Sequence, residues 1–297
     1  MSLCRLAALF GMTRQGYWKG TRASQSSALD ESALIGEVRS IRTEMPMLGC
    51  RKLQAVLSAR GHRIGRDRLF SLLRSSGMLV TRRRYRAVTT DSRHWMRKWP
   101  NLIREFTPVC YNQLWVSDIT YVETWRGDER SWRYLSLITD AYTHEIVGHA
   151  LHDSLDTEGP LRALRMALEK FPDGSVKGLI HHSDRGCQYC SAEYVGTLQD
   201  HGVRISMTEN GDPYENAVAE RVNGIIKREW LYHIRLETDG AKKKIDEIIY
   251  TYNNMRPHMS VGYLTPVEAR RMKGRQDRRW RNYYRDRTEA AAKVAAN

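Results

Sequence analysis

The 297-residue sequence predicts an α/β domain with a mixed, five-stranded central sheet, preceded by an all-α helix-turn-helix region. Two observations support this fold class. Before residue 80, apolar residues recur three or four positions apart, as on one face of a helix, whereas after residue 108 short strand-like runs alternate with helical patterns. The order of three strands, a helix, a strand, a helix, a strand and two helices predicts a mixed sheet covered by helices.

The all-α region contains three helical patterns and a short turn. The turn Gly61–Gly65 separates the last two of the patterns Leu34/Val38/Ile41, Leu53/Val56/Leu57 and Leu69/Leu72/Leu73. A glycine-containing turn between two basic helices is typical of a helix-turn-helix, whose second helix enters the major groove of DNA. We therefore expect Arg66 and Arg68, at the start of the last helix, to contact DNA. The alternative is a three-helix bundle with a solvated basic face.

The elements of the α/β domain follow from its alternating and helical apolar patterns. Strands are expected at 114–122, 134–140, 145–151, 179–182 and 203–207, and helices at 157–171, 192–202, 215–230 and 242–254. The first three strands have hairpin-like connections, so the first and the fourth strand can be neighbours in the sheet.

Composition and patterning divide the chain into five predicted segments. The stretch Thr21–Asp30 is rich in serine and is expected to be a linker. Arg82, Arg83 and Arg84 stand near aromatic residues, a composition suited to phosphates and unstacked bases, and we expect them to bind DNA. The segments are a short N-terminal helical segment (1–28), a helix-turn-helix-like domain (29–80), a basic linker (81–107), the α/β core (108–272) and a basic C-terminal tail (273–297), which could bind DNA or be solvated.

The net charge of +14 is distributed unevenly along the chain. Residues 1–107 hold 21 basic and 7 acidic residues, residues 108–255 hold 16 and 23, and residues 256–297 hold 11 and 4. An acidic middle between two basic ends is typical of a metal-dependent core flanked by segments that bind a polyanion. A generally basic soluble protein is the alternative.

The cysteines and the apolar runs indicate a cytoplasmic protein. Five cysteines, an odd number, occur without a secretory signal, which favours reduced thiols over a disulfide framework. The apolar runs are far shorter than a membrane span. Cys187 and Cys190 form one C-x-x-C pair; without a second pair, ordinary packing is favoured over a zinc or redox role.

Three carboxylates stand where a metal ligand would be useful. Asp118 lies inside an apolar strand-like run, Asp184 ends a second run, and Glu220 follows 35 residues later in a helical pattern. A charge inside an apolar strand is costly unless it is paired or bound to a cation. Carboxylate oxygens suit Mg²⁺ or Mn²⁺, and two such ions, about 3.5–4 Å apart, support in-line phosphoryl displacement by water or a DNA 3′-hydroxyl.

Further polar residues lie near these carboxylates in the sequence. Asn216, Asn223 and Lys227 share a helix face with Glu220. Lys227 is expected to contact DNA phosphate, with a solvated or ion-paired lysine as the alternative. Asn216 could position the preceding loop or cap the helix. His182 could orient a ligand or the scissile phosphate, or it could simply be packed.

The combined motifs resemble the second-frame transposases of the insertion-sequence three family. The segments that carry the resemblance are Trp115–Tyr121, His182–Tyr189, Ser206–Glu220, Tyr252–His258 and Leu264–Pro266. The core is also similar to retroviral integrases, including the basic Lys227 two turns after the glutamate. The helical region, with Gly49–Leu53 and Ile64–Leu69, is similar to the family's helix-turn-helix domain.

The resemblance implies an RNase H-like fold and a DDE active site formed by Asp118, Asp184 and Glu220 with two divalent cations, Mg²⁺ or Mn²⁺. It implies cleavage at the terminal inverted repeats of a mobile element, followed by 3′-hydroxyl attack on target DNA, within a homodimer or larger synaptic complex. A bacterial, cytoplasmic protein that associates with the nucleoid on DNA is expected.

Two departures and two alternatives accompany the resemblance. Many relatives place serine, often then phenylalanine, after the glutamate, where this chain has Arg221 and Val222. The active enzyme of the family is often a frameshift fusion with an upstream DNA-binding frame. The chain could therefore be a DNA-binding regulator, or a partial subunit of such a fusion. A host-directed nuclease is a further alternative, which the basic helix-turn-helix region disfavours.

Overall fold

The structure is a computed structural model that describes residues 11, 13–80, 96–171, 176, 178–209 and 216–276. The chain divides into two compact units, 1–82 and 83–297, here called the helical unit and the sheet unit. The predicted DNA contacts Arg82, Arg83 and Arg84 lie outside the described residues, as does most of the basic tail.

The helical unit contains the three predicted helices. They are α2 (Arg14–Glu44), α3 (Cys50–Ala59) and α4 (Arg66–Ser75), and the turn between α3 and α4 contains Gly61 at a φ of 89°. Their apolar faces form a small core whose side chains are almost fully buried, namely Leu34, Val38, Ile41, Met45, Leu48, Leu53, Leu57, Leu69 and Leu73. The spacing of apolar residues thus sets both the helices and their packed faces.

The expectation of a linker at Thr21–Asp30 is wrong, because α2 runs without interruption through that stretch. The stretch contains neither proline nor glycine, and serine, alanine, glutamine and leucine cost less than about 1 kcal/mol each in a helix. Once the packed half of α2 has nucleated, adding residues to it is favourable compared with starting a new helix.

The sheet unit contains five strands in the order β3-β2-β1-β4-β5. The strands are β1 (Leu114–Arg126), β2 (Glu129–Asp140), β3 (Ile146–His152), β4 (Ile180–Ser183) and β5 (Arg204–Met207). The first three pair antiparallel, whereas β4 is parallel to β1 and β5 is parallel to β4. This order and these directions are those of an RNase H-like fold, so the predicted fold class is confirmed.

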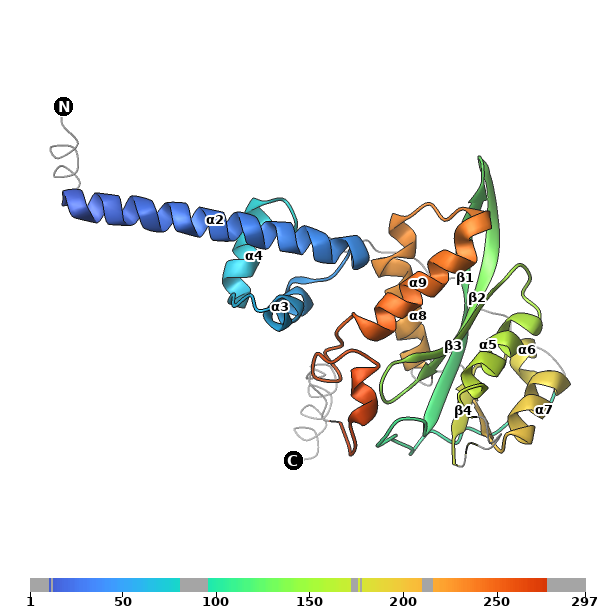
Figure 1. Ribbon diagram of the computed structural model, residues 1–297. Coiled ribbons are helices and arrows are strands. Elements are labelled where there is room, and N and C mark those ends of the chain that lie inside the picture. The colour runs from blue at the N-terminus through green and yellow to red at the C-terminus, as the bar shows by residue number, and fades with distance from the viewer. Residues whose placement is uncertain are drawn as a thin grey trace, which may run out of the picture. The chain divides into compact units, whose positions relative to one another are not determined.

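Helices cover both faces of the sheet (Figure 1). One face carries α5 (Glu158–Leu168), α6 (Cys187–Cys190) and α7 (Ala192–Asp200), and the other carries α8 (Ala217–Glu229) and α9 (Ala241–Asn254). Short 3₁₀ turns occur at η1 (Leu231–His233), η2 (Thr238–Gly240) and η3 (Glu268–Arg271).

Alternation along β1 feeds two hydrophobic cores. Trp115 packs into the larger core with Leu164 of α5 and Leu198 of α7, whereas Val116 packs with Ala219 of α8. Successive residues of a strand point to opposite faces, which explains this division. The approach of α5 to β3 is close, because a Cβ at Gly148 would lie 2.1 Å from the backbone oxygen of Ala163.

The β1–β2 hairpin extends beyond the predicted strands. It closes through Gly127, at a φ of 56°, and Asp128. Its outer half is polar, so the apolar alternation used for prediction ends early. Cross-strand contacts replace it: the guanidinium of Arg130 lies 4.7 Å from the ring centre of Trp132, and Arg235 lies 4.7 Å from that of Trp125.

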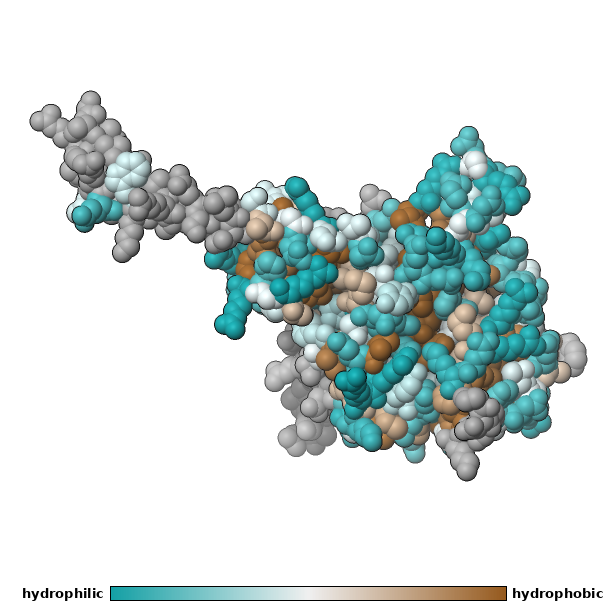
Figure 2. Space-filling view, viewed as in Figure 1, coloured by the Kyte–Doolittle hydropathy of each residue, from teal (hydrophilic) through white to brown (hydrophobic). Residues whose placement is uncertain are grey.

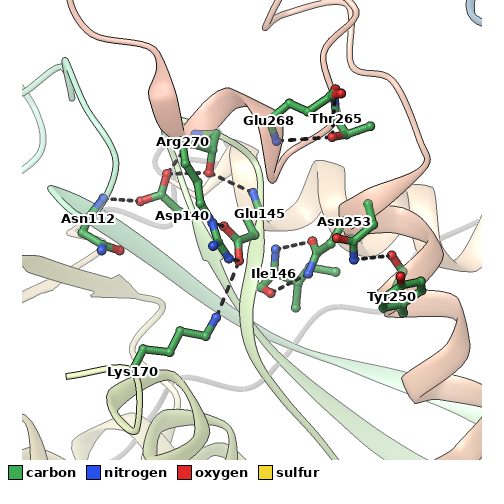
Figure 3. A network of polar contacts seen from close by, with 12 residues as sticks. Asn112, Asp140, Glu145, Ile146, Lys170, Tyr250, Asn253, Thr265, Glu268 and Arg270 are labelled. Carbon is green, nitrogen blue, oxygen red and sulfur yellow. Dashed lines mark hydrogen bonds and ion pairs between the residues drawn. The ribbon is translucent and has the colours of Figure 1, made fainter. Parts of the chain in front are cut away.

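A buried polar network ties the C-terminal segment to the turn between β2 and β3 (Figure 3). Glu145 is buried and accepts two hydrogen bonds from Arg270, at 2.6 and 2.5 Å. Asp140 accepts from the backbone of Asn112 and Thr143, each at 2.8 Å, and burial raises its pKa to about 6. Both buried acids therefore have partners, as buried charges require.

On the face shown in Figure 2, hydrophilic residues cover most of the surface, and hydrophobic residues lie in small patches between them. Within the described residues, no helix combines the length and apolar composition needed to span a membrane.

Candidate active site

The register of β1 and β4 brings Asp118 and Asp184 to the same part of the sheet. The strands are parallel, with Val116 paired to His182. Asp118 stands two residues after Val116, and Asp184 stands two residues after His182, directly beyond the end of β4. The sequence-based expectation that the first and fourth strands are neighbours is confirmed.

The carboxyl group of Asp118 lies in a strongly perturbed environment. Burial raises its pKa most, the charge of Asp184 raises it further, and Glu220 adds a smaller effect in the same direction, to about 7 in all. The amide of Asn223 opposes this rise by donating a 2.7 Å hydrogen bond from Nδ2 to Asp118 Oδ2. Like charges held together in a partly dry site would be relieved by a bound cation.

Asp184 is fixed by the turn that follows it. Its Oδ1 accepts a 2.9 Å hydrogen bond from the backbone N–H of Gly186. A Cβ at residue 186 would lie 3.0 Å from that oxygen and 2.9 Å from Oε1 of Gln188, so only glycine fits without displacing one of them. Gln188 is itself held by a 2.9 Å bond from its Nε2 to the backbone oxygen of Leu155.

Glu220 lies in the first turn of α8, and its side chain is exposed. Partial burial raises its pKa above the ordinary value. In the part of the chain that the structure describes, no three His, Cys, Asp or Glu side chains are grouped closely enough to hold a metal ion. Asp118 and Asp184 therefore interact with Glu220 through their charges, and Glu220 does not complete a three-ligand group with them.

Two asparagines of α8 face the sheet at this site. Asn216 precedes the helix and donates from Nδ2 to the backbone oxygen of Ser117, at 3.1 Å, and its side chain makes no capping bond. The capping interpretation of Asn216 is therefore wrong, because its amide is used across the interface with β1. The Oδ1 atoms of Asn216 and Asn223 are buried without a hydrogen-bond partner among the described residues.

These observations test whether the residues fit a divalent cation. The donors are carboxylate and amide oxygens, which Mg²⁺ and Mn²⁺ prefer. Two buried amide oxygens without partners and a carboxyl pKa raised by like charge both favour added positive charge or coordinated water. The donor set fits, although the third carboxylate is not grouped with the other two.

Lys227 lies one turn beyond Asn223 on α8 and is half-buried. Burial lowers its pKa, and the negative charge of Asp118 acts in the opposite direction. The ammonium group thus lies within electrostatic range of the site, which argues against a fully solvated lysine. Its expected contact with DNA phosphate stays a prediction.

His182 is fully buried within the sheet. Its Nδ1 and the Ser206 hydroxyl are hydrogen-bonded at 2.8 Å, and the same hydroxyl accepts a 2.9 Å bond from the backbone N–H of Leu102. This arrangement favours the packed histidine over a residue that orients a ligand, because the ring connects β4, β5 and the segment before β1.

Sequence reasoning did not single out Ser117 and Tyr189, whose hydroxyls are hydrogen-bonded at 3.0 Å. The signal available in the sequence was a serine inside an apolar strand, next to Asp118. Nothing in the spacing indicated that Tyr189, five residues after Asp184, would return to that strand.

The residues after the glutamate have separate surroundings. Val222 is buried in the core, whereas Arg221 is exposed and its charge lowers the pKa of both His144 and Tyr252. Arg221 thus acts on the side of α8 that faces α9 and the turn before β3.

The Arg256–His258 motif is a buried structural network. Arg256 is 1% exposed and donates to both carboxylate oxygens of Glu229, at 2.7 and 2.6 Å. Its Nη1 is also hydrogen-bonded to Nε2 of His258, at 2.8 Å. The motif therefore joins the end of α8 to the segment after α9, in agreement with the expectation that it shapes the end of the domain.

The C-x-x-C pair lies in α6, next to Asp184. Cys190 is buried and its thiol lies 3.7 Å from the sulfur of Met207, while Cys187 is exposed. The surroundings of Cys190 are those of a packed thiol, and burial raises its pKa.

In the helical unit, Arg66 and Arg68 are exposed at the start of α4, with side-chain exposures of 54% and 62%. Arg66 pairs with Asp67, and Arg68 pairs with Glu31 at 3.3 Å. Exposed ion pairs contribute about 0–1 kcal/mol, so a phosphate could displace either acid.

Comparison with known proteins places this site in a family. A family model described as integrase core domain matches residues 108–213, and a second model with the same description matches residues 201–266. The catalytic core domain of the HTLV-2 integrase, solved in complex with magnesium, shares 18% identity at a TM-score of 0.41, over 54% of this chain and 97% of that one.

Relatives in sequence carry transposase names. The uncharacterized 31 kDa protein of insertion element IS600 from Shigella sonnei is 37% identical, over 89% of this chain and 97% of that protein. The transposase for insertion sequence element IS629, also from Shigella sonnei, is 34% identical over 74% of this chain and 73% of its own length. Transposase InsF for insertion sequence IS3A from Escherichia coli K12 is 30% identical over 74% and 75%. The chain therefore belongs to the insertion-sequence three family of transposases.

Proposed function

We propose that this transposase cuts and joins DNA at the terminal inverted repeats of its element, using Asp118, Asp184 and Glu220 as the ligands of two divalent cations, Mg²⁺ or Mn²⁺. The observation that carries the proposal is the parallel pairing of β1 and β4, which sets Asp118 beside Asp184 with Glu220 in electrostatic range. When bound, such cations activate an attacking oxygen and stabilise the leaving oxygen of an in-line phosphoryl displacement.

The chain's own residues prepare the site for this reaction. Asn223 holds one oxygen of Asp118 by its 2.7 Å hydrogen bond, leaving the other oxygen to a ligand. The backbone N–H of Gly186 does the same for Asp184. Orienting a ligating carboxylate by a hydrogen bond from outside the site improves both affinity and activity. We propose that Lys227 supplies positive charge for a DNA phosphate next to the reacting bond.

Binding of duplex DNA is assigned in this proposal to the helical unit and to the basic residues around it. The exposed Arg66 and Arg68 at the start of α4 would reach the major groove or its phosphates, since α4 follows the turn as a recognition helix does. The +14 net charge of residues 1–107 supports binding to a polyanion. Arg82, Arg83 and Arg84 would add to this attraction. A homodimer or larger synaptic complex would then join two element ends.

One observation favours a second candidate function. Glu220 is exposed and is not grouped with Asp118 and Asp184 in the described structure. A chain whose third ligand joins the site only with DNA, or with an upstream-frame protein, could act alone as a DNA-binding regulator or as a partial subunit of a fusion.

The test is strand cleavage and joining on an oligonucleotide that carries the element's own terminal repeat, with Mg²⁺. Wild-type protein should give both products and Asp184→Asn neither. Equal product from the two proteins would exclude the proposed catalytic role. Activity only after fusion to the upstream frame would favour the second candidate. The flanking genomic sequence should contain inverted repeats and, for a fusion, an overlapping upstream frame.

A further inference from the structure

Ser117, the residue before Asp118, is the meeting point of the three segments that carry the carboxylates. It is 1% exposed, in the middle of β1. Its hydroxyl is hydrogen-bonded to the hydroxyl of Tyr189 at 3.0 Å, and its backbone oxygen accepts a 3.1 Å bond from Nδ2 of Asn216.

The two partners of Ser117 come from the other two carboxylate segments. Tyr189 lies on α6, five residues after Asp184, and Asn216 directly precedes α8, four residues before Glu220. One residue of β1 therefore connects the segment of Asp118 to the segment of Asp184 through a side chain, and to the segment of Glu220 through its backbone.

Packing fixes the position of the Tyr189 hydroxyl. The ring is buried, with centroid distances of 5.4 Å to Tyr194 and 6.4 Å to His181. Burial raises the pKa of Tyr189 well above its ordinary value, so the group stays a neutral hydroxyl. The Ser117 hydroxyl also lies 3.3 Å from the backbone oxygen of Leu137 on β2, which restrains it from the other side.

We propose that Ser117, Tyr189 and Asn216 are positioning residues that set the spacing of Asp118, Asp184 and Glu220, and so the affinity of the site for divalent cations. This inference rests on the proposed function. Residues that orient metal ligands from outside the site typically change metal affinity or activity by about 10–100-fold. None of the three needs to touch a cation or DNA to have this effect.

The central experiment compares Tyr189→Phe with Tyr252→Phe in the full chain. Both substitutions remove one hydroxyl from a buried ring, but the Tyr252 hydroxyl donates to the backbone oxygen of His144, at 2.9 Å. Mn²⁺ binding is measured by titration calorimetry, and cleavage is measured against Mn²⁺ concentration. Tyr189→Phe should weaken Mn²⁺ binding about tenfold and raise the half-activating concentration similarly, while Tyr252→Phe matches wild type in both.

Two results would overturn the proposal. One is wild-type Mn²⁺ binding and half-activating concentration for Tyr189→Phe. The other is equal loss in both variants, which would indicate a general effect of removing buried hydroxyls. Asp184→Asn separates this proposal from the proposed function: if it leaves Mn²⁺ binding and cleavage unchanged, the metal site itself is wrong. If it abolishes both while Tyr189→Phe has no effect, only the positioning role fails.

A double-mutant cycle adds a readout that lost stability alone would not give. Ser117→Ala removes the same hydrogen bond as Tyr189→Phe but leaves the backbone oxygen for Asn216. The double variant should bind Mn²⁺ no more weakly than the weaker single variant, because both changes delete one interaction. Ser117→Thr, which keeps the hydroxyl, should restore part of the affinity. Fully additive losses and no recovery with threonine would contradict the proposed contact.

Discussion

Asn223 donates a 2.7 Å hydrogen bond from its buried amide to Oδ2 of Asp118, across the interface between α8 and β1. The bond lowers the pKa of a carboxyl group that burial and the charge of Asp184 raise. It thereby favours the ionised form of Asp118, which is the form able to bind a cation, and it holds that carboxylate in one orientation.

Removing this bond should impair activity with little loss of fold. Asn223→Ala is expected to reduce strand cleavage about 10–100-fold, because the Asp118 carboxylate loses its orientation and its pKa rises further. Cleavage rates across pH 6–9 at fixed Mg²⁺ check this, and the rise of activity with pH should move to higher pH. Asn254→Ala, an exposed asparagine that bonds only within α9, is the control. An unshifted pH profile in Asn223→Ala would contradict the assignment.

Much of the site could be predicted because each carboxylate stands in a strongly patterned segment. Asp118 interrupts an apolar strand and Asp184 ends another, and β1 and β4 pair as the order of elements required. The orientation of α8 was less accessible. Helical spacing placed Asn223 and Glu220 on one face, but spacing does not show that the first is buried against Asp118 while the second is exposed.

The parts that were not predicted depend on contacts between segments far apart in the chain. The outer half of the hairpin has no apolar alternation, and the backbone N–H of Trp125 bonds the oxygen of Leu236, more than a hundred residues away. The bond between Ser117 and Tyr189 is similar, since it joins two segments only after β1 and β4 have paired. Local patterns carry no information on such contacts.

The raised pKa of Asp118 also predicts how stability depends on pH without metal. The pKa rises from 3.8 to about 7 on folding, so this group's contribution is fully present below pH 3.8 and is lost as pH rises through 7. Asp118→Asn should therefore be more stable than wild type above pH 8, by roughly 2–4 kcal/mol, with a much smaller gap near pH 4.5. Thermal melts in EDTA at both pH values measure this.

Adding Mg²⁺ supplies the complementary result. A cation that binds only the folded protein raises its melting temperature. Mg²⁺ should raise that of wild type at pH 8 but not that of Asp118→Asn, so the gap between them should narrow. A gap of the same size at both pH values, and with or without Mg²⁺, would contradict the environment described for Asp118.

Lys227 should matter for both DNA and the carboxylates. Its ammonium lies in electrostatic range of Asp118, so Lys227→Ala should raise the pKa of Asp118 and shift the pH profile of cleavage upward. Loss of one phosphate contact should also reduce the slope of log affinity against log salt by about one. The control is Arg228→Ala, whose Nε bonds the backbone oxygen of Gly224 on the exposed side of α8. Identical salt slopes in wild type and Lys227→Ala would exclude a phosphate contact.

The helical unit gives a separate prediction about DNA affinity. Arg66→Ala should weaken binding to the terminal repeat and lower the salt slope by about one, because its exposed guanidinium is held only by an exposed acid. Fluorescence anisotropy across a salt series measures both quantities. Arg39→Ala, which removes an exposed cation from α2, is the matched control. Equal slopes for the two variants would assign the DNA contacts elsewhere than the start of α4.

The pair formed by Arg256 and Glu229 should stabilise the sheet unit without taking part in the reaction. Arg256 is almost fully buried and donates two hydrogen bonds to Glu229, so removing one partner leaves an uncompensated charge in the interior. Arg256→Met should destabilise the unit by about 3–5 kcal/mol, which corresponds to a fall of roughly 10 °C in melting temperature. The double variant Arg256→Met with Glu229→Met removes both charges and should recover much of that stability, since the desolvation cost disappears with them. Mn²⁺ binding by the folded double variant should match wild type, because α8 keeps its contacts with β1 through Asn216 and Asn223. Weaker Mn²⁺ binding in a stably folded double variant would show that the far end of α8 also sets the position of the carboxylates.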